Sequence, residues 1–459
     1  MSTLDITDST TALPATASTD APPVTASRPR PSGGSSVDSA TVPTRLLIGL
    51  ATLTAVSPFA TDLYLAGLPQ LALDLGTTTS GAQLTLTAFL VGVAFGQLAL
   101  GPLSDRIGRR LPLVSGAAVA AIASIVTVLA PTLPMLVGAR FVQGAAGAAG
   151  MVIGRAIIAD ISSGAKAARA MGLLMTITGV APIVAPVLGG LLASPLGWRG
   201  LLGIVVGLTV VALAVALRIP ETLTLRRRAV IAASRTRAGS PLRDLVSGTF
   251  IGNAMIASFS FAAIMAYVSV SPFLYQNALG LSQAQFGLAF AGNSIALVGA
   301  TYVSARLVGR TGPRTMVTVG LSIVVLAMAT MVLAALTGAQ TRVVAAALPV
   351  MLLGFGLSQG NVAATAITSV PRASGTASAL LGFVQFALGG LASAAAGLAE
   401  GDPARSLAQV LAVSALMIVV GYVVSRPRPM SAEALAAFDR VARPERVSRP
   451  EPVRQTAEA

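Results

Sequence analysis

The chain of 459 residues contains no cysteine and no histidine. These absences exclude disulfides, thiolate and imidazole metal sites, and catalytic pairs of a nucleophile with histidine. Charge is also scarce, because Asp, Glu, Lys and Arg make up only 10% of the residues, against about 25% in soluble domains. A single soluble domain is therefore excluded, and any proton chemistry must fall on Asp, Glu, Arg, Lys or Tyr.

The only lysine is Lys166, within Ser-Gly-Ala-Lys-Ala. A phosphate-binding loop of the form Gly-x-x-x-x-Gly-Lys-[Ser/Thr] is therefore absent from the sequence. An ATP-driven pump would need a separate subunit, so an ion gradient is the expected source of energy. We expect no metal and no organic cofactor, with protons as the coupling ion.

Apolar runs fill most of the chain. A helix that crosses a bilayer needs about 20 residues, and twelve runs are close to that length. They lie at 46–68, 82–103, 112–130, 134–157, 168–193, 199–217, 248–271, 284–307, 314–337, 342–364, 374–398 and 405–424. The sequence therefore predicts an all-α polytopic membrane protein with twelve transmembrane helices.

The net charge of +14 comes from basic residues that cluster between alternate spans. Most of them follow the even-numbered spans, whereas the opposite segments carry only Arg199, Arg342 and Arg405. The positive-inside rule therefore places both termini in the cytoplasm and the chain in the inner membrane. The lipid bilayer explains the basic loops, so nucleic acid is not an expected partner.

An internal repeat divides the chain. Leu75-Gly76 precedes the second span and Leu279-Gly280 the eighth, while Asp105–Arg110 follows the second and Gly309–Arg314 the eighth, with an offset of 204 both times (279−75 and 309−105). Two matches in register indicate a duplicated six-helix half. We expect the two halves to surround a central cavity. The predicted segments are a disordered cytoplasmic tail (1–44), an N-terminal half (45–217), a basic cytoplasmic linker (218–247), a C-terminal half (248–424) and a cytoplasmic tail (425–459).

Asp62 and Arg140 lie well inside apolar spans. Asp62 is about 9 Å and Arg140 about 8 Å from the outer face, from the helical rise. An Asp near the bilayer centre costs about 2.5–3.5 kcal/mol on insertion scales, so a function is expected. The matched depth predicts that Asp62 pairs with Arg140 and takes up the coupling proton. The alternatives are an interfacial Asp62 that caps a turn and an Arg140 that extends to the surface.

The segment Gly101-Pro-Leu-Ser-Asp105-Arg106-Ile-Gly108-Arg109-Arg110 follows the second span. Its charge alone is that of a positive-inside loop, but the whole pattern resembles the signature between helices 2 and 3 of the major facilitator superfamily. The resemblance implies that Asp105 and Arg106 help to hold the two halves together in the outward-facing state. The expected conformational residues here are Gly101, Asp105, Arg106, Gly108 and Arg109. The second copy has Gly309 where the first has Asp105.

In the fifth span, Pro182, Pro186 and Gly190 are spaced by four residues and share a helix face. Proline bends a helix, and glycine lets another helix approach closely. With Gly179, this stretch resembles the helix 5 motif of antiporters, which marks exporters within the superfamily, although Ala185 replaces the usual Gly. An ordinary kinked helix is the alternative. The segment around Arg140 likewise resembles the helix 4 signature linked with proton coupling in drug antiporters.

Ser374–Gln385, Asp62-Leu-Tyr64 and the Ala-Pro pairs of the fifth span together resemble the bicyclomycin-resistance branch of drug:proton antiporters, over about residues 45–424. The resemblance implies a secondary transporter, not an enzyme, that exports small drug-like molecules; we expect a monomer. A contact with another helix is the alternative role for each residue expected in the substrate cavity. These residues are Tyr64, Gln143, Tyr267, Asn293, Gln359, Gln385 and Phe386. Rival readings are an importer or uniporter of the same fold, a membrane enzyme and a receptor-like protein.

Overall fold

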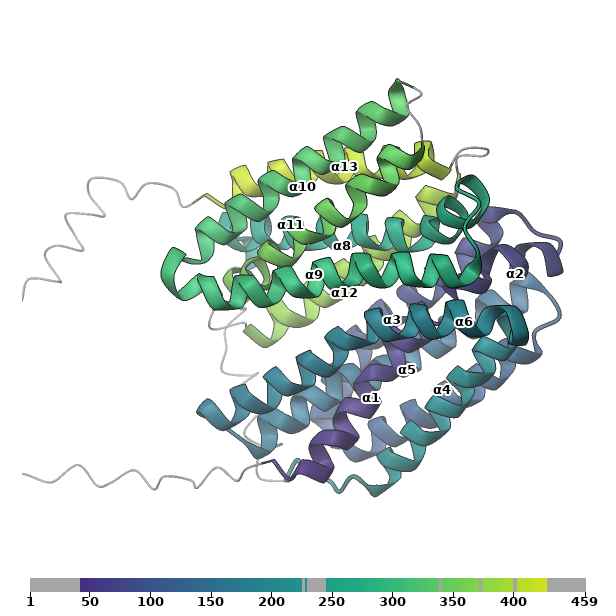
Figure 1. Cartoon of the computed structure of the whole chain (residues 1–459). Coiled ribbons are helices and arrows are strands. Elements are labelled where there is room, and N and C mark those ends of the chain that lie inside the picture. The colour runs from purple at the N-terminus through teal and green to yellow at the C-terminus, as the bar shows by residue number, and fades with distance from the viewer. Residues whose placement is uncertain are drawn as a thin grey trace, which may run out of the picture. The chain divides into compact units, whose positions relative to one another are not determined.

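The computed structural model describes residues 42–224, 228, 245–337, 341–370, 374–398 and 403–426. Most of the expected tails and of the linker lie outside these residues. The described chain is built of helices, shown in Figure 1. In the N-terminal half these are α1 Thr44–Asp62, η1 Leu65–Gly67, α2 Leu68–Asp74, α3 Thr79–Ile107, α4 Arg110–Leu129, α5 Leu133–Ile161 and α6 Gly164–Arg218. In the C-terminal half they are α8 Gly248–Pro272, η3 Phe273–Ala278, α9 Gln283–Thr311, α10 Pro313–Leu336, α11 Thr341–Thr368, α12 Ser374–Leu398 and α13 Pro403–Val424.

Eleven helical segments of the described chain are long and apolar enough to cross a membrane. One of them, Arg169–Arg218, is 50 residues long and therefore holds two spans. The two meet at Gly197, whose φ of 64° is not helical and suits a residue without a side chain. The fold thus has the twelve predicted membrane helices.

The structure repeats with the offset of the sequence. Helix α1 begins 204 residues before α8 (248−44), and α3 matches α9 at both ends (283−79 and 311−107). Both copies of the loop after the second helix of each half turn at a glycine with positive φ, which is 105° at Gly108 and 82° at Gly312. This backbone conformation favours glycine, so the motif is retained in the second half even though its Asp is not.

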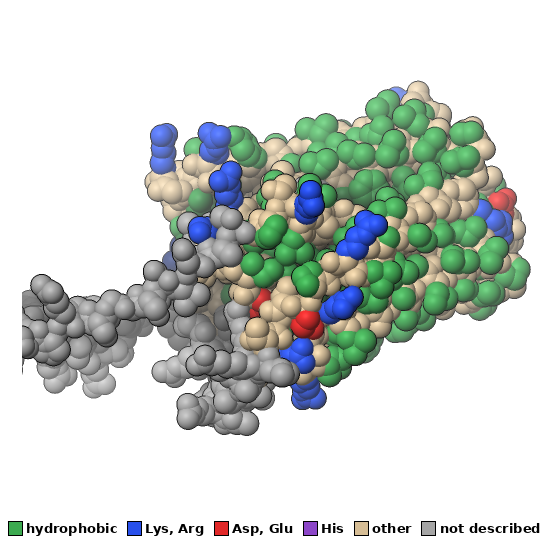
Figure 2. Space-filling model, turned by 90° about the horizontal axis from the view of Figure 1, so that it is seen from below, with side chains coloured by type: hydrophobic (Ala, Val, Ile, Leu, Met, Phe, Trp, Pro, Cys, Tyr) green, Lys and Arg blue, Asp and Glu red, His purple; other side chains and the backbone are tan. Residues whose placement is uncertain are grey.

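The two halves meet mainly along two pairs of helices, α3 with α12 and α6 with α9. Figure 1 shows the purple-to-teal half beside the green-to-yellow half along these pairs. Hereafter the basic end of the helices is the end that carries Asp105–Arg110, Arg218 and Arg306–Arg314, and the other is the opposite end. Figure 2 shows Lys and Arg side chains gathered toward one end of the visible face, with apolar side chains over most of the remainder.

The halves are in close contact at the opposite end. Ser80 donates a hydrogen bond to the carbonyl of Gly397, Gln83 Nε2 to that of Ser269 (3.1 Å), and Gln276 Nε2 to that of Ala66 (3.1 Å). All three bonds join a side chain of one half to the backbone of the other.

Toward the basic end, α6 and α9 have no comparable contact. A Cβ atom added at Gly179 or at Gly309 would have no described atom within 4 Å apart from those of the adjoining residues of its own helix. Thr176 of α6 and Tyr302 of α9 are exposed. Along α6 and α9 the described chain is therefore closed at the opposite end and open at the basic end.

Candidate functional site

The first membrane helix is broken beside Asp62. Helix α1 ends at Asp62, Leu63 and Tyr64 follow, and the chain continues as η1 and α2. Gly189 of α6 packs against the carbonyl of Leu63 so closely that a side chain there would clash with it. Broken membrane helices commonly build the binding sites of transporters, because their backbone ends supply polar groups within the membrane.

Asp62 is buried at this break and is the only carboxylate among the buried residues of the described chain. It forms no ion pair with any described residue. A buried carboxylate without a cation is costly in its charged form, so its protonation state responds strongly to its surroundings. The structure therefore puts a buried titratable group at the break of the first membrane helix.

Arg140 of α5 is fully buried, but not against Asp62. Its guanidinium lies 4.5 Å from the ring centroids of both Tyr64 and Phe89, and Nη1 donates to Gln143 Oε1 at 2.7 Å. Its Nη2 has no hydrogen-bond partner. The expected Asp62–Arg140 ion pair is absent because the guanidinium is held between two aromatic rings, which attract cations through their π faces.

Two of the predicted cavity residues belong to this Arg140 cluster. Tyr64 bonds Thr85 Oγ1 at 3.1 Å, and Gln143 Nε2 donates to Ser124 Oγ at 2.7 Å. Both side chains are buried within the N-terminal half. In this conformation they are helix–helix contacts, the alternative considered for them, and their contact with a substrate stays a prediction.

Two other predicted cavity residues meet in the C-terminal half. Asn293 Nδ2 of α9 donates to the hydroxyl of Tyr267 at 2.9 Å and to that of Tyr275 at 3.0 Å. All three side chains are buried. They form a polar cluster within the C-terminal half.

The remaining predicted cavity residues, Gln359, Gln385 and Phe386, are partly exposed. Gln385 Nε2 donates to the Ala257 carbonyl at 3.4 Å, and the Phe386 ring lies 4.9 Å from that of Phe261. A separate cavity of about 450 Å³ lies at the opposite end, with Gln83 and Asn277 among its lining residues. None of the seven predicted cavity residues lines it.

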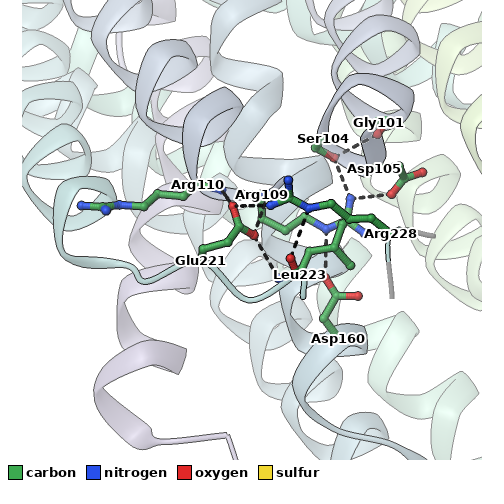
Figure 3. Close-up of polar contacts among 9 residues, drawn as sticks. All are labelled: Gly101, Ser104, Asp105, Arg109, Arg110, Asp160, Glu221, Leu223 and Arg228. Atoms are coloured by element: carbon green, nitrogen blue, oxygen red, sulfur yellow. Dashed lines mark hydrogen bonds and ion pairs between the residues drawn. The ribbon is translucent and has the colours of Figure 1, made fainter. Parts of the chain in front are cut away.

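The loop after α3 forms an ionic cluster at the basic end, shown in Figure 3. Arg109 binds Asp105 at 2.5 Å, Asp160 of α5 at 2.9 Å and Ser104 Oγ at 2.7 Å. Arg106, by contrast, is exposed. Asp105 bonds Arg109 of its own half, and the role between the halves that is expected for Asp105 and Arg106 in the outward-facing state stays a prediction. Burial opposes the charge of Arg109, but the bonds and charges of Asp160 and Asp105 outweigh it and raise the pKa of Arg109.

Glu221, just after α6, caps the first turn of α4, although it lies more than a hundred residues farther along the sequence. Its carboxylate accepts from the backbone N–H of Arg109 (3.0 Å), Arg110 (3.2 Å) and Leu223 (2.9 Å). Arg228 adds an ion pair at 3.4 Å. Partial burial would raise the pKa of Glu221, but these N–H groups and the Arg228 charge together lower it.

The helix 5 motif divides into two parts. The shared face of Pro186 and Gly190 packs tightly on α9, where Gly190 contacts Gln283 and Gly287. Gly179 has no close neighbour outside its own helix among the described residues. The part of the motif at Pro186 and Gly190 therefore makes the contact between the halves. The part at Gly179 lies nearer the basic end, where α6 is not packed on α9.

Sequence reasoning did not single out Tyr275, Asp160 or Glu221. Asp160 lies at the end of the predicted fourth span, where an acid is ordinary, and Glu221 lies in a loop otherwise notable for its arginines. Tyr275 is one of only five tyrosines. The scarcity of tyrosine in an apolar chain was the one sequence signal that could have drawn attention to Tyr275. It did not indicate which residue Tyr275 would bond.

Comparison with known proteins agrees with this architecture. The family model of the Major Facilitator Superfamily matches residues 50–394. An uncharacterized MFS-type transporter, YdgK of Bacillus subtilis, is 33% identical over 76% of this chain and 88% of its own. A bicyclomycin resistance protein homolog of Haemophilus influenzae is 29% identical over 82% and 94%, and the multidrug resistance protein MdtL of Shewanella oneidensis is 27% identical over 80% and 92%.

Solved structures share the fold. A bacterial homolog of the human lysosomal transporter Spinster superposes with a TM-score of 0.67 at 17% identity, over 84% of this chain and 97% of its own. A D-xylose–proton symporter gives 0.65 at 16% identity, over 82% and 97%. With the family model matching three quarters of the sequence and relatives that are transporters rather than enzymes, the chain belongs to the Major Facilitator Superfamily.

Proposed function

We propose that this transporter exports small drug-like organic molecules from the cytoplasm in exchange for protons. Its basic end is the cytoplasmic end, both termini lie on that side, and the membrane is the bacterial inner membrane. Relatives named as bicyclomycin and multidrug resistance proteins support the direction and the substrate class. The helix 5 motif that packs on α9 supports export over import.

The burial of Asp62 at the break of helix 1, without an ionic partner among the described residues, carries the proton part of the proposal. Such a carboxylate changes charge when its surroundings change, which is what a proton-coupled cycle needs. One charge moving through 100 mV supplies about 2.3 kcal/mol. A single proton per cycle therefore sustains a useful outward gradient.

In the proposed cycle, substrate enters a central cavity from the basic end while Asp62 is ionised. The halves rock and expose the cavity at the opposite end, where substrate leaves and a proton neutralises Asp62. The protonated carrier returns and releases the proton to the cytoplasm. Arg140 does not pair with Asp62 in this conformation; it is assigned the role of a fixed positive charge that holds Tyr64, two residues beyond the carboxylate.

An antibiotic panel in an efflux-deficient host, with and without a protonophore, identifies the substrate. That compound then serves in proteoliposomes with an imposed pH gradient. Asp62→Asn should insert normally and abolish uphill export. Asp74→Asn is the matched control, because Asp74 lies on the same segment and its one bond to a described residue is accepted from Trp198, which an Asn side-chain oxygen can also accept. Uphill export by the Asp62→Asn variant would show that Asp62 is not the coupling group.

An importer or uniporter of the same fold is the second candidate. The direction of proton-driven flux in inverted vesicles separates the two. An exporter would raise the substrate concentration inside such vesicles, and an importer would lower it.

A further inference from the structure

Arg155 of α5 is an arginine within a membrane helix that the proposed cycle does not use. It lies six residues before the end of the helix at Ile161 (161−155), which is about 9 Å along the axis. Helix α5 runs toward the basic end, where Asp160 bonds Arg109. An arginine at this depth either extends to the end of the helix, where water hydrates it, or has a function within the membrane.

The Arg155 side chain is turned away from the basic end. Side chains on an α-helix lean toward its N-terminus, which for α5 is at the opposite end. Arg155 Nε donates to the Met151 carbonyl, one turn back along the helix, at 2.9 Å. Because this bond keeps the guanidinium beside Met151, Arg155 does not anchor the helix at the membrane boundary in this conformation.

Most of the hydrogen-bonding capacity of this guanidinium is unused within the described chain. Four N–H groups remain on Nη1 and Nη2 of Arg155, and no hydrogen bond or ion pair joins them to a described residue. Neither nitrogen is among the buried side-chain atoms that lack a partner, so both have exposed surface. Arg155 as a whole is partly exposed. A positive charge is therefore accessible within the span of α5.

The packing of α5 shows which side of the helix carries Arg155. The adjacent Gly154 packs on α1, and α5 also packs along α3. Met151 lies on the same side as Arg155, four residues away. The side chains of Met151, Phe59 of α1 and Phe386 of α12 pack against one buried cluster, and each is partly exposed. Since α12 belongs to the C-terminal half, Arg155 lies on the side of α5 that faces that half, one turn nearer the basic end.

We propose that Arg155 binds the anionic group of the transported molecule, and that the substrates of this carrier are small organic anions with an apolar body. This inference rests on the proposed function, since it names the substrate class of the same exporter. A guanidinium binds a carboxylate or sulfonate through two parallel N–H bonds, and Arg155 has donors for both. The exposed surfaces of Met151, Phe59 and Phe386, one turn farther from the basic end, receive the apolar body.

An organic anion also suits the energetics of the proposed exchange. The membrane potential is negative inside, so an anion that leaves and a proton that enters both move charge in the favourable direction. Taking an anion out of water is costly unless a positive group replaces its hydration. Arg155 supplies that positive group on the side from which substrate enters. A carrier of neutral molecules has no need of an unpaired cation at this depth.

The first test asks whether position 155 is reached from the basic side. The chain has no cysteine, so Arg155→Cys introduces a single thiol. Inverted vesicles, which expose the proposed cytoplasmic side, are treated with 2-sulfonatoethyl methanethiosulfonate, an anion that does not cross membranes. Arg155→Cys should be labelled. Ile157→Cys is the control on the same helix and should not react, because Ile157 is fully buried. Absence of labelling at Arg155→Cys overturns the inference.

The second test measures the binding of an anion and of its neutral analogue to the full chain in lipid nanodiscs. The probes are radiolabelled 2-naphthoate and 2-naphthamide, followed by scintillation proximity. Arg155→Gln should weaken the binding of 2-naphthoate at least tenfold, because it removes charge-assisted hydrogen bonds, and should leave that of 2-naphthamide unchanged. Arg155→Lys, which keeps the charge without the fork, should fall between. Arg106→Gln is the control, because Arg106 is exposed at the basic end, and should bind both probes as the parent does.

Two outcomes of the binding test contradict the proposal. No binding of 2-naphthoate by the parent chain overturns the substrate class. An equal loss of both probes in Arg155→Gln overturns the role of the charge and shows a structural role instead. If Arg155→Gln does not fold, Arg155→Lys decides by the ratio of the two affinities. The proposed function fails separately, by uphill export in Asp62→Asn, because neither labelling nor binding involves transport.

Discussion

At the scale of single residues, Arg140 is held both on the faces of its guanidinium and at its edge. A guanidinium is planar and always charged, and it stacks on aromatic faces while its edge donates hydrogen bonds. Arg140 uses both properties, with Tyr64 and Phe89 against its plane and Gln143 at its edge. A lysine has the charge but neither the plane nor the fork, so this site distinguishes the two cations.

Arg140→Lys should therefore destabilise the protein although it keeps the charge. Loss of two cation–π contacts and the Gln143 bond amounts to about 1–3 kcal/mol, which should appear as a lower unfolding midpoint in scanning fluorimetry. Arg155→Lys on the same helix is the control, because Arg155 is partly exposed and, among the described residues, bonds only the Met151 carbonyl of its own helix. Equal midpoints for the two variants would contradict this account of the cluster.

Asp62 and Arg140, the two residues singled out inside apolar spans, are both buried but do not pair with each other. Counting residues from the helix ends predicted a similar depth in the membrane for them, and that depth stays a prediction. Counting did not give the rotation of α5 or the break after Asp62, which decide which side chains meet. The ring of Tyr64, two residues along, occupies the position expected for the carboxylate beside Arg140.

At the scale of elements, the twelve spans were predictable because length and apolarity are strong signals in a membrane chain. The predicted span 46–68 matches α1 at its start, but the helix breaks at Asp62 and resumes as α2 to Asp74. The break depends on packing, since Gly189 of α6 fits against Leu63. No local signal near Leu63 reveals a glycine more than a hundred residues away.

The cap of α4 by Glu221 leads to a prediction that depends on pH. Because the folded-state pKa of Glu221 is lowered, the carboxylate stabilises the fold above its unfolded pKa, near 4.5. That stability is lost as the pH falls through the lower folded-state value. Glu221→Ala should thus cost about 1 kcal/mol at neutral pH, the usual value of a helix cap, and less under acid conditions.

Chemical unfolding of the parent chain and Glu221→Ala, measured at pH 7 and again below pH 4.5, tests this dependence. Arg106→Gln is the control at the same end, because Arg106 is exposed. A difference between parent and Glu221→Ala that stays constant across this range would show that the carboxylate charge is not the source of the cap.

At the scale of the whole molecule, the duplicated halves were visible in the sequence as matched dipeptides 204 residues apart. The conformation could not be predicted from the sequence, because the same chain must adopt at least two arrangements of its halves in order to transport a substrate. Three side-chain bonds to the backbone close the opposite end in this arrangement. They are uncharged, so they open without separating ions in the membrane.

The strength of that closure can be measured on the chain itself, which has no cysteine and so accepts spin labels without background. Leu73 and Asn277 are exposed at the opposite end on different halves, and Arg169 and Arg310 are exposed at the basic end. Gln83→Leu with Gln276→Leu removes two inter-half bonds worth about 2 kcal/mol together, roughly a thirtyfold change in the ratio of the two conformations. Longer Leu73–Asn277 and shorter Arg169–Arg310 distances should then become populated together.

Gln70→Leu is the control, because it makes the same substitution at the same end and Gln70 forms no hydrogen bond to a described residue. It should leave both distance distributions unchanged. If the two distances fail to change in opposite senses, the halves do not rock as rigid bodies about the α3–α12 and α6–α9 contacts.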